Sequence, residues 1–450
     1  MALKRKRKPV SVGFVALGCP KNMVDSEVML ARIGQGGFVL SDNPDNADVV
    51  VINTCGFIAP AKEEALDAIR NAVTQKKKKH VRKVIVAGCL SERMGQGLLD
   101  EIEGIDAVIG LSERDRIAEI IQNCLAAKKK APPGIHIEHS DAGIHDDRGR
   151  LLITPRHWAY LRISEGCDRK CSFCTIPAIR GGFRSKPQEM VLAEAAELVD
   201  NGAVELSIIA QDSNFYGRDR GVKNGLIGLL DALEKIESLK WIRLMYLYPA
   251  GIDDALIEKI AESEKVIPYI DMPIQHINND ILKSMRRTDT REYTVALVEK
   301  LRQAMPDAAL RTTVIVGYPG ETSQQFNELL EFVKWAQFDA LGCFMFYPEV
   351  GTAAADMPRQ VPDVVKQQRM DTLMRTQQER IFAKMDARIG SELTVLVDEV
   401  ADNQAAGRYY GQAPYIDSLC RIQSGSARPG DFIQTKITAR DGYDFLVEPI

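Results

Sequence analysis

Short apolar runs alternate with helical patterns between residues 11 and 348 of this 450-residue chain, with one polar interruption. In the first part we expect strands at 11–17, 47–53 and 84–87 and helices at 24–36, 62–75 and 115–127. Alternating strand and helix units of this length favour a parallel sheet with helices on its faces. The sequence therefore predicts an α/β protein whose amino-terminal domain, residues 10–125, is an open parallel sheet.

A cysteine closes each of the three strands predicted for this domain, in Leu-Gly-Cys19, Asn-Thr-Cys55 and Ala-Gly-Cys89. Ligands of an open α/β sheet bind in the crevice outside the carboxyl ends of its strands. One buried cysteine at a strand end is ordinarily a small hydrophobic residue. Three at equivalent positions favour convergence, so we expect Cys19, Cys55 and Cys89 to form a three-thiolate cluster site.

The alternation resumes after the polar stretch 126–152, which is predicted to be a linker with solvent-exposed histidines at positions 136, 139 and 145. Six further strands are expected, at 159–164, 205–210, 242–247, 269–274, 310–316 and 340–346, with helices between them. Repeated units of this kind favour a barrel or partial barrel whose active site lies at the carboxyl ends of the strands. We assign residues 153–388 to this domain, with a long final helix at 363–388.

Three cysteines with the spacing C-x3-C-x2-C, Cys167, Cys171 and Cys174, follow the first of these strands. Structural zinc sites and ordinary 4Fe–4S clusters have four protein ligands. Three thiolates on one loop can hold a cubane cluster and leave one iron open to a substrate or cofactor. A zinc site with a distant fourth ligand is the alternative. Gln211, Asp212 and Gly317 also follow strands, so we expect them at the same mouth as cofactor contacts, whereas His276 either faces the mouth or is satisfied by its neighbours.

The last segment, residues 389–450, contains short strand-like runs separated by turn residues and is predicted to be a small antiparallel β-barrel of the OB type. From residue 388 onward it carries six Arg and Lys against nine Asp and Glu, a net charge of −3. Affinity for nucleic acid comes largely from basic residues that neutralise phosphates. The acidic tail therefore favours a basic protein partner.

Composition excludes several classes of protein. The chain is 45% hydrophobic and 27% charged, with a net charge of −4, and no apolar run reaches the ~18 residues of a membrane span. Its basic start lacks the apolar core of a secretory signal. Nine cysteines without an export signal indicate reduced thiols, so a cytoplasmic location and no membrane association are expected. Cys124, Cys343 and Cys420 are expected to be packing residues.

The Cys167–Cys174 loop, placed after a strand and with Phe173 as its aromatic residue, resembles the signature of the radical S-adenosylmethionine enzymes. In that family the open iron chelates S-adenosylmethionine, and electron transfer cleaves it to a 5′-deoxyadenosyl radical. Over its whole length the chain resembles the methylthiotransferases within that family, whose carboxy-terminal barrel is a TRAM domain. The supporting stretches are Leu-Gly-Cys19-Pro-Lys-Asn, Asn53-Thr-Cys55-Gly, Ala-Gly-Cys89-Leu, Cys174-Thr-Ile-Pro-Ala-Ile-Arg-Gly, Asp271-Met-Pro-Ile-Gln-His276 and Arg311-Thr-Thr-Val-Ile-Val-Gly317.

The resemblance implies S-adenosylmethionine and two 4Fe–4S clusters as cofactors, with no catalytic residues beyond the cluster ligands. The Cys167/Cys171/Cys174 set would generate the radical, with Phe173 in its loop, and the Cys19/Cys55/Cys89 set would hold the sulfur that is delivered. A second S-adenosylmethionine would supply the methyl group, and a flavodoxin or ferredoxin would supply electrons.

The motifs are most similar to the branch that methylthiolates the β-carbon of an aspartate in ribosomal protein uS12. The sister branch, which modifies a tRNA adenosine, is the runner-up, although we expect no direct tRNA substrate. A non-catalytic iron–sulfur electron carrier or ribosome-assembly module is the alternative from another class. The open iron argues against a carrier, because a carrier gains nothing from a vacant coordination site.

Overall fold

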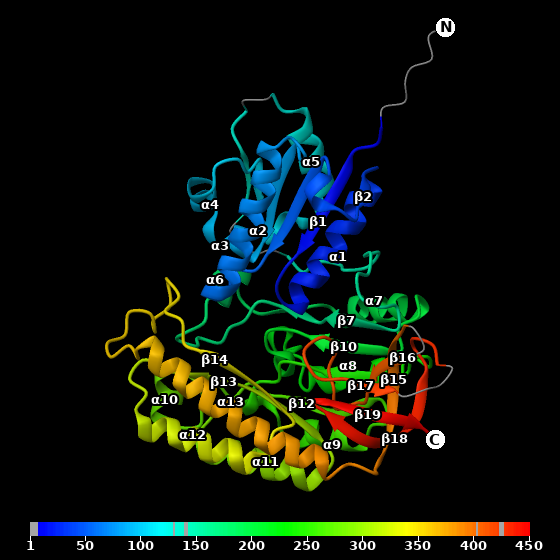
Figure 1. Ribbon diagram of the computed structural model, residues 1–450, viewed down its shortest axis with the longest axis vertical. Helices are drawn as coiled ribbons and strands as arrows, with labels where there is room; N and C mark the ends of the chain where they lie inside the picture. Colours follow the sequence, from blue (N-terminus) through cyan, green and yellow to red (C-terminus); the bar gives the residue numbers. More distant parts are fainter. Residues whose placement is uncertain (1–7, 129–130, 139–142, 402–403, 423–426) are drawn as a thin grey trace. The chain divides into compact units, whose positions relative to one another are not determined.

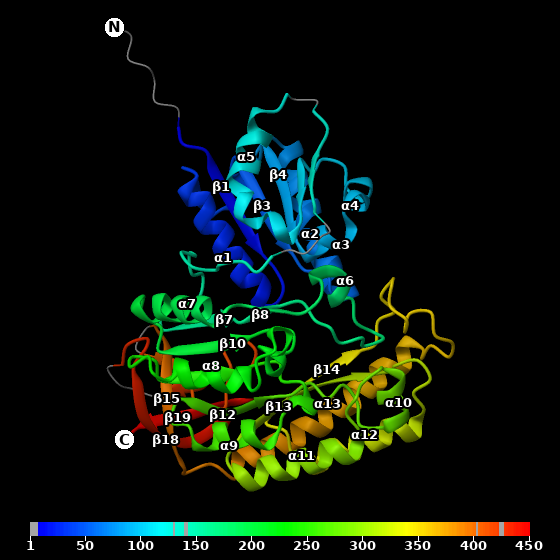
Figure 2. The ribbon, with the colours of Figure 1, turned by 180° about the vertical axis from the view of Figure 1, so that it is seen from behind.

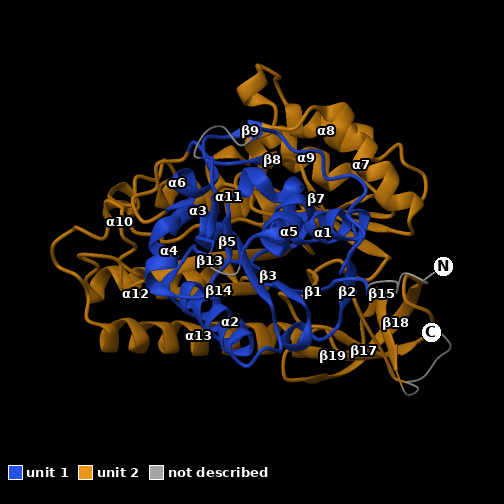
Figure 3. Ribbon diagram, turned by 90° about the horizontal axis from the view of Figure 1, so that it is seen from above, with its two compact units in different colours: residues 1–153, 165–168, 175–184 blue, residues 154–164, 169–174, 185–450 orange. Residues whose placement is uncertain are grey.

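The computed structural model describes residues 8–128, 131–138, 143–401, 404–422 and 427–450. The chain divides into two compact units, coloured separately in Figure 3. The first comprises residues 1–153 together with two short pieces, 165–168 and 175–184. The second comprises residues 154–164, 169–174 and 185–450. The chain therefore passes back and forth between the units around the C-x3-C-x2-C loop, and each unit is described by itself.

The first unit contains a six-stranded parallel sheet with the order β2-β1-β3-β4-β5-β6 (Figure 1). Its strands are β1 (Ser11–Ala16), β2 (Val39–Ser41), β3 (Val49–Thr54), β4 (Lys83–Gly88), β5 (Ala107–Ile109) and β6 (Gly134–His136). The expected open parallel sheet is confirmed. Strands β2, β5 and β6 have three residues each, too few for a periodic pattern, and β6 lies within the stretch expected to be a linker.

Helices cover both faces of this sheet because its long strands are buried on both sides. On one face Val50, Ile52, Val84 and Val86 pack against α2 (Ala59–Lys77), α3 (Cys89–Met94) and α4 (Gln96–Glu101). On the other face the alternate residues Val49, Val51 and Ile85 pack against α1 (Pro20–Gln35) and α5 (Ile117–Ala126). Neighbouring residues of one strand thus serve two separate cores, as a buried parallel sheet requires.

The polar stretch after α5 is less exposed than expected. His136 is half-buried in β6, and His145 Nδ1 lies 3.1 Å from Asp115 Oδ2. His139 lies outside the described residues. Further along, Arg150 and Asp147 are buried, and Arg150 Nε is 3.2 Å from Glu27 Oε2 on α1. These ion pairs bind the stretch to the first unit.

The second unit is built on a six-stranded parallel sheet, β14-β13-β12-β11-β10-β7, in which consecutive strands are neighbours (Figures 1 and 2). The strands are β7 (Trp158–Arg162), β10 (Glu205–Ile209), β11 (Trp241–Leu244), β12 (Val266–Asp271), β13 (Ala309–Val316) and β14 (Ala340–Met345). The helices are α7 (Gln188–Asp200), α8 (Gly225–Leu233), α9 (Asp254–Glu262), α10 (Asn279–Ser284), α11 (Arg291–Ala304) and α12 (Ser323–Ala336). Because β7 and β14 do not pair, this is the expected partial barrel.

Three short elements lie beside the C-x3-C-x2-C loop. The two-residue strands β8 (Ser164–Glu165) and β9 (Arg184–Ser185) pair with each other, and the short helix α6 (Ile176–Arg180) follows the loop. These pieces were not predicted, because strands of two residues and a helix of five are too short to show a periodic pattern.

The long helix α13 (Asp363–Asp386) leads into a closed five-stranded barrel, β15-β16-β17-β19-β18. Its strands are β15 (Glu392–Ala401), β16 (Gln404–Arg408), β17 (Cys420–Ile422), β18 (Phe432–Asp441) and β19 (Asp444–Pro449). The expected small barrel is confirmed, but it is not wholly antiparallel, since β17 and β19 pair in parallel. Five strands cannot alternate in direction all the way around a closed barrel, so at least one pair must be parallel.

Buried ion pairs join this barrel to the partial barrel within the second unit. Arg408 of β16 lies 2.7 Å from Glu205 of β10 and 2.7 Å from Asp398 of β15, and His157 contacts Asp398 at 2.8 Å. Asp417 likewise accepts a hydrogen bond from the Tyr269 hydroxyl at 2.7 Å. Two of the acids counted toward a substrate-binding charge therefore hold the two barrels together.

No helix among the described residues is long and apolar enough to cross a membrane.

Candidate metal centres and cofactor site

Cys19, Cys55 and Cys89 follow the carboxyl ends of three strands at one edge of the first sheet. They follow β1, β3 and β4, which are adjacent strands, and Cys19 and Cys89 lie at the starts of α1 and α3. A Cβ added to Gly18, whose φ is +93°, would lie 3.4 Å from Cys55 Sγ. The Cys19 loop thus packs directly onto Cys55, and a side chain at position 18 would collide with that cysteine.

Asn22 fastens these strand ends to one another, a role that the sequence analysis missed. Its Nδ2 donates to Leu17 O at 3.1 Å and to Thr54 O at 2.7 Å, while its Oδ1 lies 3.4 Å from Cys89 Sγ. It is buried in the first turn of α1. One amide therefore contacts the ends of β1 and β3 and the cysteine that follows β4.

A buried cation also borders these thiols. Arg180, the last residue of α6, belongs to the first unit, and its Nη2 lies 3.3 Å from Cys89 Sγ. The same nitrogen donates to Asn22 Oδ1 at 2.8 Å and to Asp25 Oδ2 at 3.1 Å. Nη1 donates to Glu165 Oε2 at 3.0 Å. The sequence motif that contains Arg180 was visible, but its contact with a cysteine 91 positions away was not.

The chemistry of this donor set fits an iron–sulfur cluster. Burial raises the pKa of the Cys55 thiol, and it raises the pKa of Cys89 to about 12 against the lowering effect of Arg180. Without metal these thiols are therefore protonated, and a soft cation would bind by displacing their protons. Within the described residues no three His, Cys, Asp or Glu side chains are arranged for one metal ion. A cubane gives each thiolate its own iron, so its ligands stand farther apart than those of a single ion.

The C-x3-C-x2-C loop is divided between the units, with Cys167 in the first and Cys171 and Cys174 in the second. Within the second unit, Ser172 anchors the loop, since its N–H donates to Met285 O at 3.0 Å and its hydroxyl lies 2.8 Å from the Tyr318 hydroxyl. Phe173 packs against the cluster formed by Ile281, Met285, Tyr318, Phe346 and Ala354. The aromatic residue of the motif thus fixes the loop to the partial barrel.

Asp212 holds the middle of the same loop. Arg169, between Cys167 and Cys171, donates from Nε to Asp212 Oδ2 at 2.8 Å, and Asp212 is only 2% exposed. Burial raises the pKa of Asp212, whereas Arg169 opposes the rise. The Arg169 guanidinium also lies 3.9 Å from the ring centroid of Tyr248. Gln211 is half-buried beside Asp212 at the end of β10.

Gly317 has a structural reason to be glycine. Its φ is +72°, and a Cβ would lie 2.2 Å from Lys366 Cγ on α13. The N–H groups of Gly317 and Tyr318 donate to Glu321 Oε2 at 2.6 and 3.2 Å. Burial raises the pKa of Glu321 to about 7, opposed by Arg369 at 2.9 Å. The N–H of Gly317, a residue expected to contact a cofactor, therefore donates to a carboxylate of the protein itself.

His276, expected either to face the mouth or to be satisfied by its neighbours, is fully buried and has only one of its ring nitrogens hydrogen-bonded among the described residues. The Asn278 N–H donates to Nδ1 at 3.0 Å, so a neutral ring carries its proton on Nε2, which has no hydrogen-bond partner among the described residues. Burial lowers the pKa of His276 to about 3. Cys124 and Cys420 are buried in hydrophobic cores, as expected of packing residues, and Cys343 is half-buried on β14.

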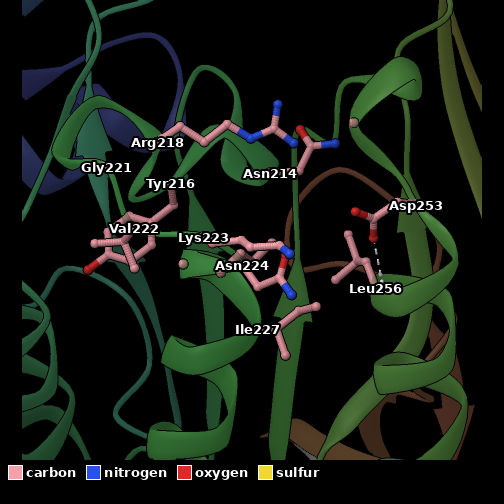
Figure 4. Close-up of a pocket in the computed structure, with 13 residues that line it drawn as sticks. Asn214, Tyr216, Arg218, Gly221, Val222, Lys223, Asn224, Ile227, Asp253 and Leu256 are labelled. Atoms are coloured by element: carbon pink, nitrogen blue, oxygen red, sulfur yellow. Dashed lines mark hydrogen bonds between the residues drawn. The ribbon is translucent and has the colours of Figure 1, made fainter.

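A cavity of about 410 Å³ lies beside the loop that follows β10 (Figure 4). Arg218 and Lys223 reach into it from one side, and Asp253, which accepts a hydrogen bond from Leu256 N at 3.0 Å, lies opposite. None of the residues predicted to bind cofactor lines this cavity.

Three family models match the chain. The radical SAM superfamily model matches residues 161–333, the TRAM domain model matches 389–450, and the model described as uncharacterized protein family UPF0004 matches 11–110. The ribosomal protein uS12 methylthiotransferase RimO of Citrifermentans bemidjiense is 43% identical over 452 residues, covering 100% of this chain and 99% of the relative. The chain belongs to the RimO family. RimO of Geobacter sulfurreducens is also 43% identical, covering 98% of each chain.

Membership of this family makes the protein a radical S-adenosylmethionine methylthiotransferase, and it confirms the resemblance seen in the cysteine motifs. The family's cofactors are S-adenosylmethionine and 4Fe–4S clusters. Two solved structures of the radical S-adenosylmethionine methyltransferase TsrM from Kitasatospora setae share the fold, with TM-scores of 0.52 and 0.53. They are 15% and 14% identical and cover 77% and 75% of this chain, and 77% and 73% of their own chains. At this identity the likeness concerns the fold alone.

Proposed function

We propose that this RimO family member methylthiolates the β-carbon of an aspartate in ribosomal protein uS12. The observation that carries the proposal is the presence of two separate three-cysteine sets in one chain. One set lies at the carboxyl edge of a parallel sheet, and the other lies on the loop after β7. Relatives that are named ribosomal protein uS12 methylthiotransferase match nearly the whole chain, and the matched length includes both cysteine sets.

The inertness of the substrate explains why such a site is needed. A β-carbon C–H bond of aspartate is too weakly acidic for a side-chain base, so the hydrogen must leave as an atom. A cluster held by Cys167, Cys171 and Cys174, with S-adenosylmethionine, would supply that chemistry when bound. Arg169 and Asp212 orient the loop through their ion pair of 2.8 Å, and Ser172 and Phe173 fix it to the partial barrel.

Cys19, Cys55 and Cys89 are the proposed ligands of the second cluster, which would hold the sulfur that is delivered. Three protein ligands leave one iron open, as in the first set. We place Gln211 and Asp212 near the cofactor because they lie at the end of β10, and Gly317 contributes by shaping the neighbouring turn. A flavodoxin or ferredoxin is the proposed electron donor, and a ribosomal substrate implies a cytoplasmic location.

Two other functions make different predictions. A tRNA adenosine methylthiotransferase would use the same clusters on a different substrate, and we propose no direct tRNA substrate. An electron carrier or ribosome-assembly module would not cleave S-adenosylmethionine.

Mass spectrometry of ribosomal proteins and tRNA from a deletion strain separates these functions. We expect uS12 to lose the mass of one methylthio group that replaces a hydrogen, with tRNA unchanged. Plasmid-borne wild type should restore the mass, and a Cys167→Ala variant should not. Loss of a methylthio group from tRNA instead would move the protein to the sister branch, and no change in either would favour a non-catalytic role.

A further inference from the structure

Among the described contacts, Arg180 is the one arginine whose guanidinium contacts a sulfur of the Cys19/Cys55/Cys89 set. Its side chain is only 2% exposed, and every contact described for it above lies within the first unit. Glu165, which pairs with its Nη1, lies two residues before Cys167, and Arg180 lies six residues after Cys174. The two flanks of the radical-generating loop are thus joined by an ion pair beside Cys89.

We infer that Arg180 is a positioning residue that holds a permanent positive charge against the Cys89 sulfur and favours the reduced state of a cluster bound there. The inference rests on the proposed role of Cys19, Cys55 and Cys89 as cluster ligands. Reduction adds one negative charge to a cluster, and its potential depends on nearby charge and on hydrogen bonds to its sulfurs. A guanidinium nitrogen 3.3 Å from Sγ in a buried site supplies both.

The surrounding acids set how strongly this charge acts. Asp25 is shared between Arg180 and Arg114, whose Nη1 lies 2.8 Å from its other oxygen, and Arg114 also pairs with Asp147 at 2.7 Å. Glu165 faces the Nη1 side of Arg180, away from the nitrogen on Cys89. Removing the Glu165 charge should therefore leave Arg180 less compensated without touching the cysteine.

A merely structural Arg180 would hold α6 in place without changing the cluster's potential. Charge and shape can be separated by substitution. Arg180→Lys keeps the positive charge, Arg180→Gln keeps a hydrogen-bonding side chain without charge, and Glu165→Gln removes the counter-charge. Arg114→Gln is the matched control, because it removes a buried arginine from the same network that has no described contact with a cysteine.

The test uses full-length protein carrying Cys167→Ala, Cys171→Ala and Cys174→Ala, so that one cluster is measured. Iron content and an EPR-monitored redox titration are recorded for each variant. For Arg180→Gln we expect the reduced fraction at a fixed potential to fall about tenfold, a shift of about 59 mV to more negative potential. Arg180→Lys should stay close to the parent, Glu165→Gln should shift to more positive potential, and Arg114→Gln should move least.

An Arg180→Gln protein that keeps its iron and the parent's potential overturns the inference. If that variant binds no iron, Glu165→Gln decides the matter, because a positive shift supports the inference and an unchanged potential refutes it. Failure of the proposed cluster-ligand role looks different, since the parent itself would then bind no iron at the Cys19/Cys55/Cys89 set.

Discussion

Gly317 and Glu321 shape the turn that follows β13 at the mouth of the partial barrel. The turn depends on a left-handed glycine whose missing side chain leaves room for Lys366, and on a buried carboxylate that accepts two backbone N–H groups. The burial that raises the pKa of Glu321 to about 7 comes from the same close packing. A small change at position 317 should therefore disturb backbone, lysine and carboxylate together.

Substituting Gly317→Ala should destabilise the second unit. The left-handed backbone alone costs about 1–2 kcal/mol for a residue with a Cβ, and the contact with Lys366 adds to that. Urea unfolding followed by circular dichroism measures the loss. Gly342→Ala on β14 is the matched control, because its nearest new contact would be an ordinary 3.6 Å. Equal stability of the two variants would contradict this account of Gly317.

His276 should make the protein less stable in mild acid. Its folded pKa of about 3 lies below the 6.5 of an exposed histidine, so between these values the unfolded chain binds the extra proton. Stability therefore falls as the pH drops below 6.5, by about 2 kcal/mol at pH 5. The measurement is the change in unfolding free energy between pH 7.5 and pH 5.

In His276→Gln that change should shrink by about the same amount. His80→Gln, which alters an exposed histidine at the end of α2, should leave it as in wild type. An acid response of His276→Gln equal to that of wild type would show that the ring is charged or solvated in the folded protein.

The two barrels of the second unit are joined, at the scale of elements, by charge as well as by apolar contact. Arg408 of β16 is 1% exposed and contacts carboxylates from β10 and β15, and Arg243 of β11 pairs with the same Glu205 at 2.8 Å. Breaking a buried pair leaves an uncompensated charge, which costs more than the pair itself contributes. The small barrel therefore depends on the partial barrel.

Replacing Arg408→Met should cost about 3–5 kcal/mol, because Glu205 and Asp398 would each lose a cation. The same change should expose the connection between α13 and β15 to limited proteolysis. Arg421→Met serves as the control, since its side chain is 58% exposed and a surface pair contributes less than about 1 kcal/mol. If both variants resist protease like wild type, the barrels are held together by other contacts.

Periodic patterns predicted the long elements of this fold and missed what depends on distant residues. Strands such as β3 and β13 carry enough apolar residues to be recognised, whereas β2, β5 and β6 are three residues long. The three cysteines after β1, β3 and β4 could be grouped because parallel strands end at one edge. The roles of Asn22, Arg180 and Glu321 could not be predicted, because tertiary packing determines their partners. Nor could the sequence show that two acids of the tail, Asp398 and Asp417, are paired within the second unit.

Iron content tests the number of clusters in the whole molecule. Each three-cysteine set is proposed to hold one 4Fe–4S cubane, so anaerobically reconstituted protein should contain about eight irons. Changing Cys167, Cys171 and Cys174 to Ala should leave about four, and changing Cys19, Cys55 and Cys89 should also leave about four. A wild-type preparation with only four irons, or with zinc, would refute the two-cluster assignment.

The division of labour between the two cysteine sets is the central claim, and one assay of reconstituted enzyme tests it most directly. Cleavage of S-adenosylmethionine and the mass of uS12 are measured together for wild type and for the Cys19→Ala, Cys55→Ala, Cys89→Ala variant. The variant should still cleave S-adenosylmethionine, because its radical-generating loop is intact, and should transfer no sulfur to uS12. A variant that makes fully methylthiolated uS12 would contradict the claim.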